Sequence, residues 1–146
     1  MSEGNVIAII GVALCVILCG IGSAIGLFKT GSAAAGVLGE NPKNFGQVLV
    51  LVLLPATQGI YGFIIAIIAS GSLATNMVLW QGWAFFGAVV PMMLSGLITG
   101  IFQGKSAVNC IYAAGKQEGL GMKLLIYPAM IEFYAILGLI ISIMII

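Results

Sequence analysis

Four long apolar stretches follow one another along the chain, separated by three short polar connections. They cover residues 6–38, 48–70, 80–112 and 124–146. About 20 apolar residues cross a bilayer as a helix. Inside hydrocarbon the backbone must satisfy its own hydrogen bonds, which leaves helices or closed barrels. No stretch alternates with a period of two, so the pattern predicts an all-α membrane protein with four transmembrane helices.

Composition agrees with lipid as the solvent of this chain. Hydrophobic residues make up 62% of the sequence and charged residues 6%, far below what a soluble surface needs. The net charge is +1 and there is no basic run, so we expect no nucleic-acid partner. Cys15, Cys19 and Cys110 lie in apolar stretches without an accompanying His or carboxylate, so we expect them to be packing residues.

The connections predict the orientation of the chain. Residues 39–44 and 115–119 combine turn residues with charges, whereas residues 71–76 carry no charge. The lysines lie in or toward the first and third connections. The positive-inside rule therefore places these two in the cytoplasm and both termini outside a multi-pass protein of the cell membrane.

The two halves of the sequence resemble each other. At an offset of 73 or 74 residues, ten positions are identical: Gly22, Gly26, Phe28, Ser32, Ala33, Pro55, Ala56, Tyr61, Ile67 and Ile68 match Gly96, Gly100, Phe102, Ser106, Ala107, Pro128, Ala129, Tyr134, Ile140 and Ile141. We interpret this as two tandem-duplicated antiparallel hairpins, residues 1–76 and 77–146. Both would enter the membrane in the same orientation, unlike the halves of inverted-repeat transporters.

Small residues distinguish the first and third stretches from the other two. They form stripes at a spacing of four residues, which let helix backbones approach closely in lipid. The residues are Gly22, Gly26, Gly96, Gly100 and Gly104. We expect the first and third helices to pack tightly inside an assembly, with the second and fourth helices outside.

Glu132 lies within the last apolar stretch and is the chemically decisive residue. An ionised acid at mid-bilayer costs about 3 kcal/mol on insertion scales. Such a residue is rarely structural, so we expect a deeply buried functional carboxylate that binds a cation. Glu3, Glu40 and Glu118 lie in termini or connections instead.

Polar residues of two other stretches fall at the depth of Glu132. Gln103 and Glu132 lie equally far from the midpoint of the third connection, and Gln58 lies at nearly that distance from Pro42 in the first. At about 1.5 Å per residue, all three share one level. Thr57 precedes Gln58, and Tyr61 lies three residues beyond it on the same helix face.

This set of groups suits a small hard cation. Carboxylate and amide oxygens prefer such ions. A proton needs only the carboxyl and one hydrogen-bond partner, although the glutamines could also be interhelical hydrogen bonds worth about 0.6 kcal/mol each. Gly59 occupies the repeat position of Glu132, so the chain has one charged site per four helices. A site at mid-depth with no charged relay to either surface suggests that the site itself moves.

At this point the chain resembles the c/K-type proteolipids, the membrane rotor proteins of V-type rotary ATPases. The likeness covers essentially the whole chain, and the motifs at residues 54–61 and 131–134 are typical of the bacterial sodium-type members. The resemblance implies a homo-oligomeric ring that turns against a stator membrane subunit and is connected through central-stalk subunits to ATP hydrolysis or synthesis elsewhere. It implies Na⁺ as the ion, with no organic cofactor. Its ligands would be the main-chain carbonyl of Leu54, Thr57, Gln58, Gln103 and Glu132, with Tyr61 holding Glu132 closed.

Three alternatives remain at this stage. The same rotor could carry H⁺, because burial favours the neutral form of an acid. A small secondary transporter should show discontinuous helices and a site between oppositely oriented repeats. A structural four-helix protein would leave Glu132 as an unexplained cost. No nucleotide-binding loop of the Gly-rich Lys-Ser/Thr type occurs in the sequence, so we expect no nucleotide site on this chain.

Overall fold

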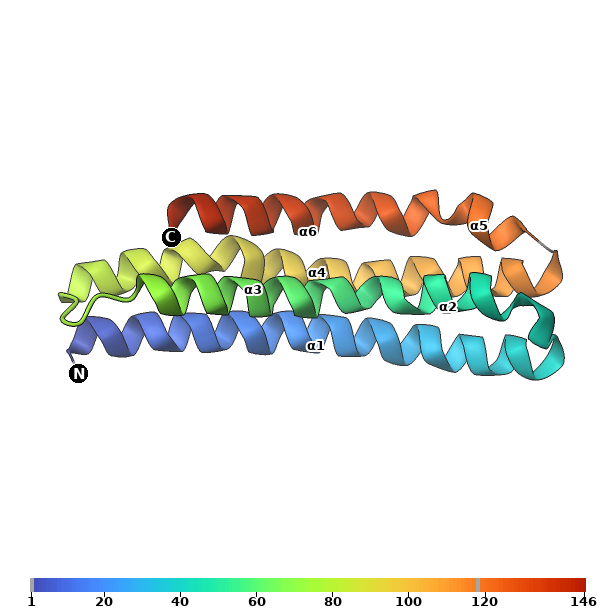
Figure 1. Cartoon of the computed structure of the whole chain (residues 1–146), viewed down its shortest axis with the longest axis horizontal. Helices are drawn as coiled ribbons and strands as arrows, with labels where there is room; N and C mark the ends of the chain where they lie inside the picture. The colour runs from blue at the N-terminus through green and yellow to red at the C-terminus, as the bar shows by residue number, and fades with distance from the viewer. Residues whose placement is uncertain (1, 118) are drawn as a thin grey trace.

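The computed structural model describes residues 2–117 and 119–146, and folds them into four helical columns side by side (Figure 1). The first and third columns are single helices of 38 residues each, α1 (Glu3–Glu40) and α4 (Leu79–Lys116). All four columns are long and apolar enough to cross a membrane. The described part of the chain has no strand, so the predicted all-α fold with four transmembrane helices is confirmed.

The second and fourth columns are each interrupted once. The second runs through α2 (Phe45–Leu53), the short 3₁₀ helix η2 (Leu54–Ala56) and α3 (Thr57–Ser72). The fourth consists of α5 (Leu120–Leu124) and α6 (Ile126–Ile145). Each interruption lies close to a proline, Pro55 in the second column and Pro128 in the fourth. Proline lacks the backbone N–H that would continue the hydrogen-bond ladder. The second and fourth columns are therefore discontinuous, which the sequence pattern had not indicated.

The two hairpins have the same orientation. The connections around η1 (Pro42–Asn44) and Gly119 lie at one end of the bundle, and the connection over residues 73–78 lies at the other (Figure 1). Columns one and three thus run parallel, as do columns two and four. This arrangement differs from the oppositely oriented repeats expected of a secondary transporter. Residue 118, within the third predicted connection, lies outside the described residues.

The most extensive contact between helices in the bundle joins α1 and α4, and glycines let the two backbones approach closely. A Cβ added to Gly22 would lie 2.6 Å from the carbonyl oxygen of Leu97, and one added to Gly100 would lie 2.6 Å from the carbonyl carbon of Gly22. Gly96 and Gly104 face α1 in the same way, toward Cys19 and Gly26. The five glycines of the sequence stripes therefore bring α1 and α4 together within one chain. Their role between chains stays a prediction.

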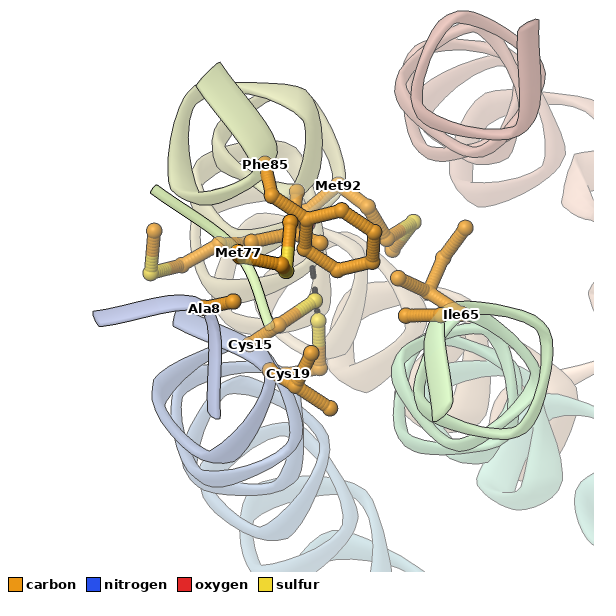
Figure 2. Close-up of a cluster of buried hydrophobic side chains, with 11 residues drawn as sticks. Ala8, Cys15, Cys19, Ile65, Met77, Phe85 and Met92 are labelled. Carbon is orange, nitrogen blue, oxygen red and sulfur yellow. Dashed lines mark hydrogen bonds between the residues drawn. The ribbon is translucent and has the colours of Figure 1, made fainter. Parts of the chain in front are cut away.

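Two apolar clusters fill the bundle on either side of the level of Glu132. Figure 2 shows the first, where Cys15 and Cys19 of α1 face Met92 of α4 and Ile65 of α3. The Cys19 thiol lies 3.4 Å from the carbonyl oxygen of Met92. The second cluster gathers residues such as Leu51 and Ile111 toward the α5 end. All three cysteines are free and buried, as expected of packing residues.

Candidate cation-binding site

Glu132 of α6 accepts four hydrogen bonds from side chains of two other columns. Its Oε2 atom lies 2.9 Å from Thr57 Oγ1, 3.1 Å from Gln58 Nε2 and 2.7 Å from Gln103 Nε2. Its Oε1 atom lies 2.6 Å from the hydroxyl of Tyr61. Four hydrogen-bond donors from two columns thus point at one carboxyl group. The structure thus places a carboxylate where three columns meet.

The sequence expectation about burial needs correction. Gln58 and Gln103 are fully buried, but Glu132 is only half-buried in the single chain. Its neighbours Phe133 and Tyr134 are 64% and 67% exposed, because this face of α6 points away from the bundle. The carboxylate therefore lies at the edge of the bundle, with its polar partners on the inner side.

The second column brings its polar groups to Glu132 through helix periodicity and a local break. Thr57, Gln58 and Tyr61 follow one another at helical spacing and lie on one face of α3. The turn η2 just before them contains Pro55 and is followed by Thr57, whose backbone N–H bonds to the carbonyl of Leu54. The Thr57 hydroxyl lies 2.9 Å from this same carbonyl oxygen. The break therefore holds the Leu54 carbonyl beside the side chains that contact Glu132.

The two glutamines connect the helices around the carboxylate. Gln58 Nε2 lies 2.7 Å from Gln103 Oε1, and Gln103 Nε2 lies 3.2 Å from the carbonyl oxygen of Pro128. The Oε1 atom of Gln58 is buried and has no hydrogen-bond partner. A buried amide oxygen without a partner is costly, and a cation would satisfy it.

The donor set fits a small hard cation. The Leu54 carbonyl, the Thr57 hydroxyl, the Gln58 amide oxygen and the Glu132 carboxylate are all oxygen groups, and oxygen ligands suit such ions. The one negative charge matches a monovalent ion. Among the described residues, no cluster of three or more His, Cys, Asp or Glu side chains is present that could hold a transition metal.

All six residues proposed from the sequence lie together: Leu54, Thr57, Gln58, Tyr61, Gln103 and Glu132. Sequence reasoning missed the carbonyl of Pro128 as a partner of Gln103. The recurrence of proline at the same place in both halves was the signal that could have indicated it.

The first hairpin has no equivalent site. Gly59, at the repeat position of Glu132, faces α1, and a Cβ added there would lie 3.2 Å from the hydroxyl oxygen of Ser23. Lys29 and Lys105 line a separate cavity of about 550 Å³ between α1 and α4, together with Phe28 and Tyr112. The Lys105 ammonium lies 5.1 Å from the ring centroid of Phe102.

Fold and site together define a class: membrane proteins built from two parallel-oriented helical hairpins with one carboxylate in the last span. The family model described as the C subunit of ATP synthase matches twice, over residues 10–69 and 86–145. The chain belongs to this family of ATP synthase C subunits.

Three relatives illustrate this membership. The chain is 45% identical to the K subunit of the V-type sodium ATPase of Enterococcus hirae, covering 97% of this chain and 90% of the relative. It is 35% identical to the K subunit of the A-type ATP synthase of Methanocaldococcus jannaschii, covering 99% of this chain but 63% of that longer relative. It is 32% identical to a subunit of the V-type proton ATPase of Saccharomyces cerevisiae, covering 92% and 67%.

Proposed function

We propose that this chain is a rotor-ring subunit of a bacterial V-type ATPase that binds one Na⁺ at Glu132 and carries it across the membrane by rotation. The observation that supports the proposal best is the convergence of two buried amides and a hydroxyl on a single carboxylate. Residues 1–76 and 77–146 act as two halves of one duplicated unit, and only the second half carries the carboxylate of the site.

Sodium is favoured over the proton by the surplus of oxygen groups. A protonated carboxyl needs one acceptor, whereas the site offers several neutral oxygens, among them the unpartnered Oε1 of Gln58. An amide that donates to the empty carboxylate can present its oxygen to a bound cation after rotation about its terminal bond. The name of the Enterococcus hirae relative, a sodium ATPase subunit, supports the same ion.

The half-exposed position of Glu132 suggests how the ion is exchanged. In lipid, a neutral site with bound Na⁺ and the Tyr61 bond closed can rotate at little electrostatic cost. Next to a stator membrane subunit with a polar path, Tyr61 can swing away and the ion can leave. Glu132, left ionised, must take up another ion before it returns to hydrocarbon, and this requirement couples rotation to transport.

The remaining parts of the machine lie on other chains. A homo-oligomeric ring of these subunits would turn with central-stalk subunits whose partners hydrolyse or synthesise ATP. The present chain would then supply ion translocation and no nucleotide chemistry. Both termini would face outside, with the connections at 39–44 and 115–119 in the cytoplasm, where the central stalk could contact them.

Competition between sodium and protons at Glu132 tests the proposal. A hydrophobic carbodiimide reacts with the protonated carboxyl, so bound Na⁺ should protect Glu132 from labelling. Since Na⁺ binds the ionised form, protection should strengthen as pH rises and weaken as pH falls. Lithium should protect better than potassium, because a site of few protein oxygens does not widen easily. Labelling of purified rings that follows pH alone and ignores Na⁺ would indicate a proton rotor and overturn the sodium assignment.

A further inference from the structure

Thr30 of α1 is buried and touches the break in the second column, although α1 contributes no ligand to the candidate site. Its side chain is fully inaccessible, and its hydroxyl lies 3.1 Å from the carbonyl oxygen of Val52. The hydroxyl also lies 3.2 Å and 3.1 Å from the carbonyls of Gly26 and Leu27 in its own helix. With a single proton, it can donate fully to one of these three acceptors.

The Val52 carbonyl is the one acceptor of the three that belongs to the second column, near the end of α2 and just before the break. In an uninterrupted α-helix this carbonyl would accept from the backbone N–H of Ala56. At η2 the ladder changes to bonds between residues three apart, such as the one from the Thr57 N–H to the Leu54 carbonyl. The carbonyls of Gly26 and Leu27 keep their donors within α1. The Thr30 hydroxyl therefore supplies a donor from α1 to a carbonyl at the point where the regular ladder of the second column is interrupted.

Gly26, one helical turn before Thr30, has no side chain and so leaves room for the same interrupted segment. A Cβ added to Gly26 would lie 2.5 Å from the Cβ atom of Pro55 and 2.5 Å from the carbonyl oxygen of Gly100. The proline ring thus packs directly on the α1 backbone. Gly26 and Thr30 of α1 thus both contact the second column around the break that contains Leu54.

The second hairpin uses a related arrangement. There Gln103 of α4 lies 3.2 Å from the carbonyl oxygen of Pro128, near the start of α6. In both hairpins a side chain of the long helix therefore bonds a backbone carbonyl of the interrupted column, that of Val52 three residues before Pro55 and that of Pro128 itself. Gln103 also reaches Glu132 itself, whereas Thr30 reaches only the backbone.

We propose that Thr30 is a positioning residue for the cation site: through Val52 it holds the break in the geometry that directs the Leu54 carbonyl and the Thr57 hydroxyl at the ion. This inference rests on the proposed sodium function. Losing the bond lets the Leu54 carbonyl move, which weakens binding of Na⁺. Protonation of Glu132 does not need this carbonyl and stays as it was.

The test compares three variants in purified full-chain rings by carbodiimide labelling of Glu132. Thr30→Val keeps the shape and removes the hydroxyl, and Thr30→Ser keeps the hydroxyl. Thr99→Val is the matched control, because Thr99 is also buried but bonds only the carbonyl of Ser95 in its own helix, at 2.7 Å. Each is titrated with Na⁺ at fixed pH, and separately with pH in the absence of Na⁺.

For Thr30→Val we expect half-protection to need about tenfold more Na⁺, the effect of losing one net hydrogen bond. Thr30→Ser and Thr99→Val should stay within about twofold of the parent chain. The pH profile without Na⁺ should be the same in all four proteins. A purely structural role would shift that profile or lower ring yield instead.

Each other outcome has a distinct meaning. If Na⁺ protects Thr30→Val rings as well as it protects parent rings, the role of Thr30 is overturned and the sodium function stands. An equal loss in Thr99→Val would show general loosening and also overturn it. Parent rings that ignore Na⁺ would remove the sodium function, and the inference with it. If Thr30→Val fails to assemble, Thr30→Cys, a weak donor of similar size, should need about threefold more Na⁺, and no change there would count against the proposal.

Discussion

Tyr61 donates a hydrogen bond of 2.6 Å to the Oε1 atom of Glu132, the carboxylate oxygen that the other three donors leave unoccupied. Thr57, Gln58 and Gln103 all approach Oε2 instead. The Tyr61 hydroxyl thus holds the carboxylate oxygen that the two glutamine amides do not contact. It does so from the partly exposed edge of the bundle, where an ion would have to pass.

Tyr61→Phe should loosen this closure without removing an ion ligand. We expect Na⁺ to bind about three- to tenfold more weakly and to exchange faster, since the lost bond went to a charged group at a half-exposed position. Exchange of radioactive sodium on purified rings would measure both. Tyr134→Phe is the matched control, because Tyr134 is the repeat counterpart of Tyr61 and is 67% exposed. Equal effects of the two variants would contradict a closing role for Tyr61.

Glu132→Gln should abolish ion transport and carbodiimide labelling together. The amide keeps the size of the side chain but cannot balance the charge of a cation. Transport by the reconstituted complex and labelling of the chain are the two measurements. Glu40→Gln, at the end of α1 and away from the site, should retain both activities. Full transport by Glu132→Gln would refute the assignment of the carboxylate.

Gln103→Ala should weaken protection of Glu132 by Na⁺ about tenfold, a plausible loss for one charge-assisted contact. The charge of the site is unchanged, so some protection should remain at high Na⁺. Gln47→Ala serves as control, since Gln47 lies in α2 outside the site and its amide oxygen has no partner. Wild-type protection in Gln103→Ala would show that the amide is only an interhelical hydrogen bond.

Gly100→Leu should prevent formation of the ring while leaving insertion into the membrane intact. The added side chain would meet the α1 backbone at 2.6 Å, and two packed backbones cannot separate locally. Native mass spectrometry of detergent extracts would report assembly, and the membrane fraction would report insertion. Gly87→Leu is the control on the same helix, because an added Cβ meets nothing within 4 Å there. Intact rings from Gly100→Leu would contradict the importance of this contact.

Much of the fold follows from the sequence because lipid permits few alternatives. Four charge-poor stretches and three short connections define the columns, and counting from the connections places Gln58, Gln103 and Glu132 at one level. Helix length per residue is fixed, so depth is predictable.

Other features depend on which way each helix faces, and periodicity alone does not determine that. The half-burial of Glu132 follows from the rotation of α6, which the pattern of a uniformly apolar helix does not indicate. The bond from Thr30 goes to the backbone carbonyl of Val52, and backbone groups carry no signal in the side-chain pattern. The glycine stripes predicted the close packing of the first and third helices, which the structure shows within one chain, and contact between chains stays a prediction.

Gly59 has an energetic consequence for the proposed machine. Because the first hairpin packs a glycine against Ser23 where the second has Glu132, the proposed ring would move one ion for every four helices. In such a machine the ATP consumed per revolution would be set by the other subunits and would not depend on this ring. Halving the ions moved per revolution doubles the free energy available to each one. In the proposed machine, the duplicated chain would therefore move fewer ions per revolution but could drive each one against a steeper gradient.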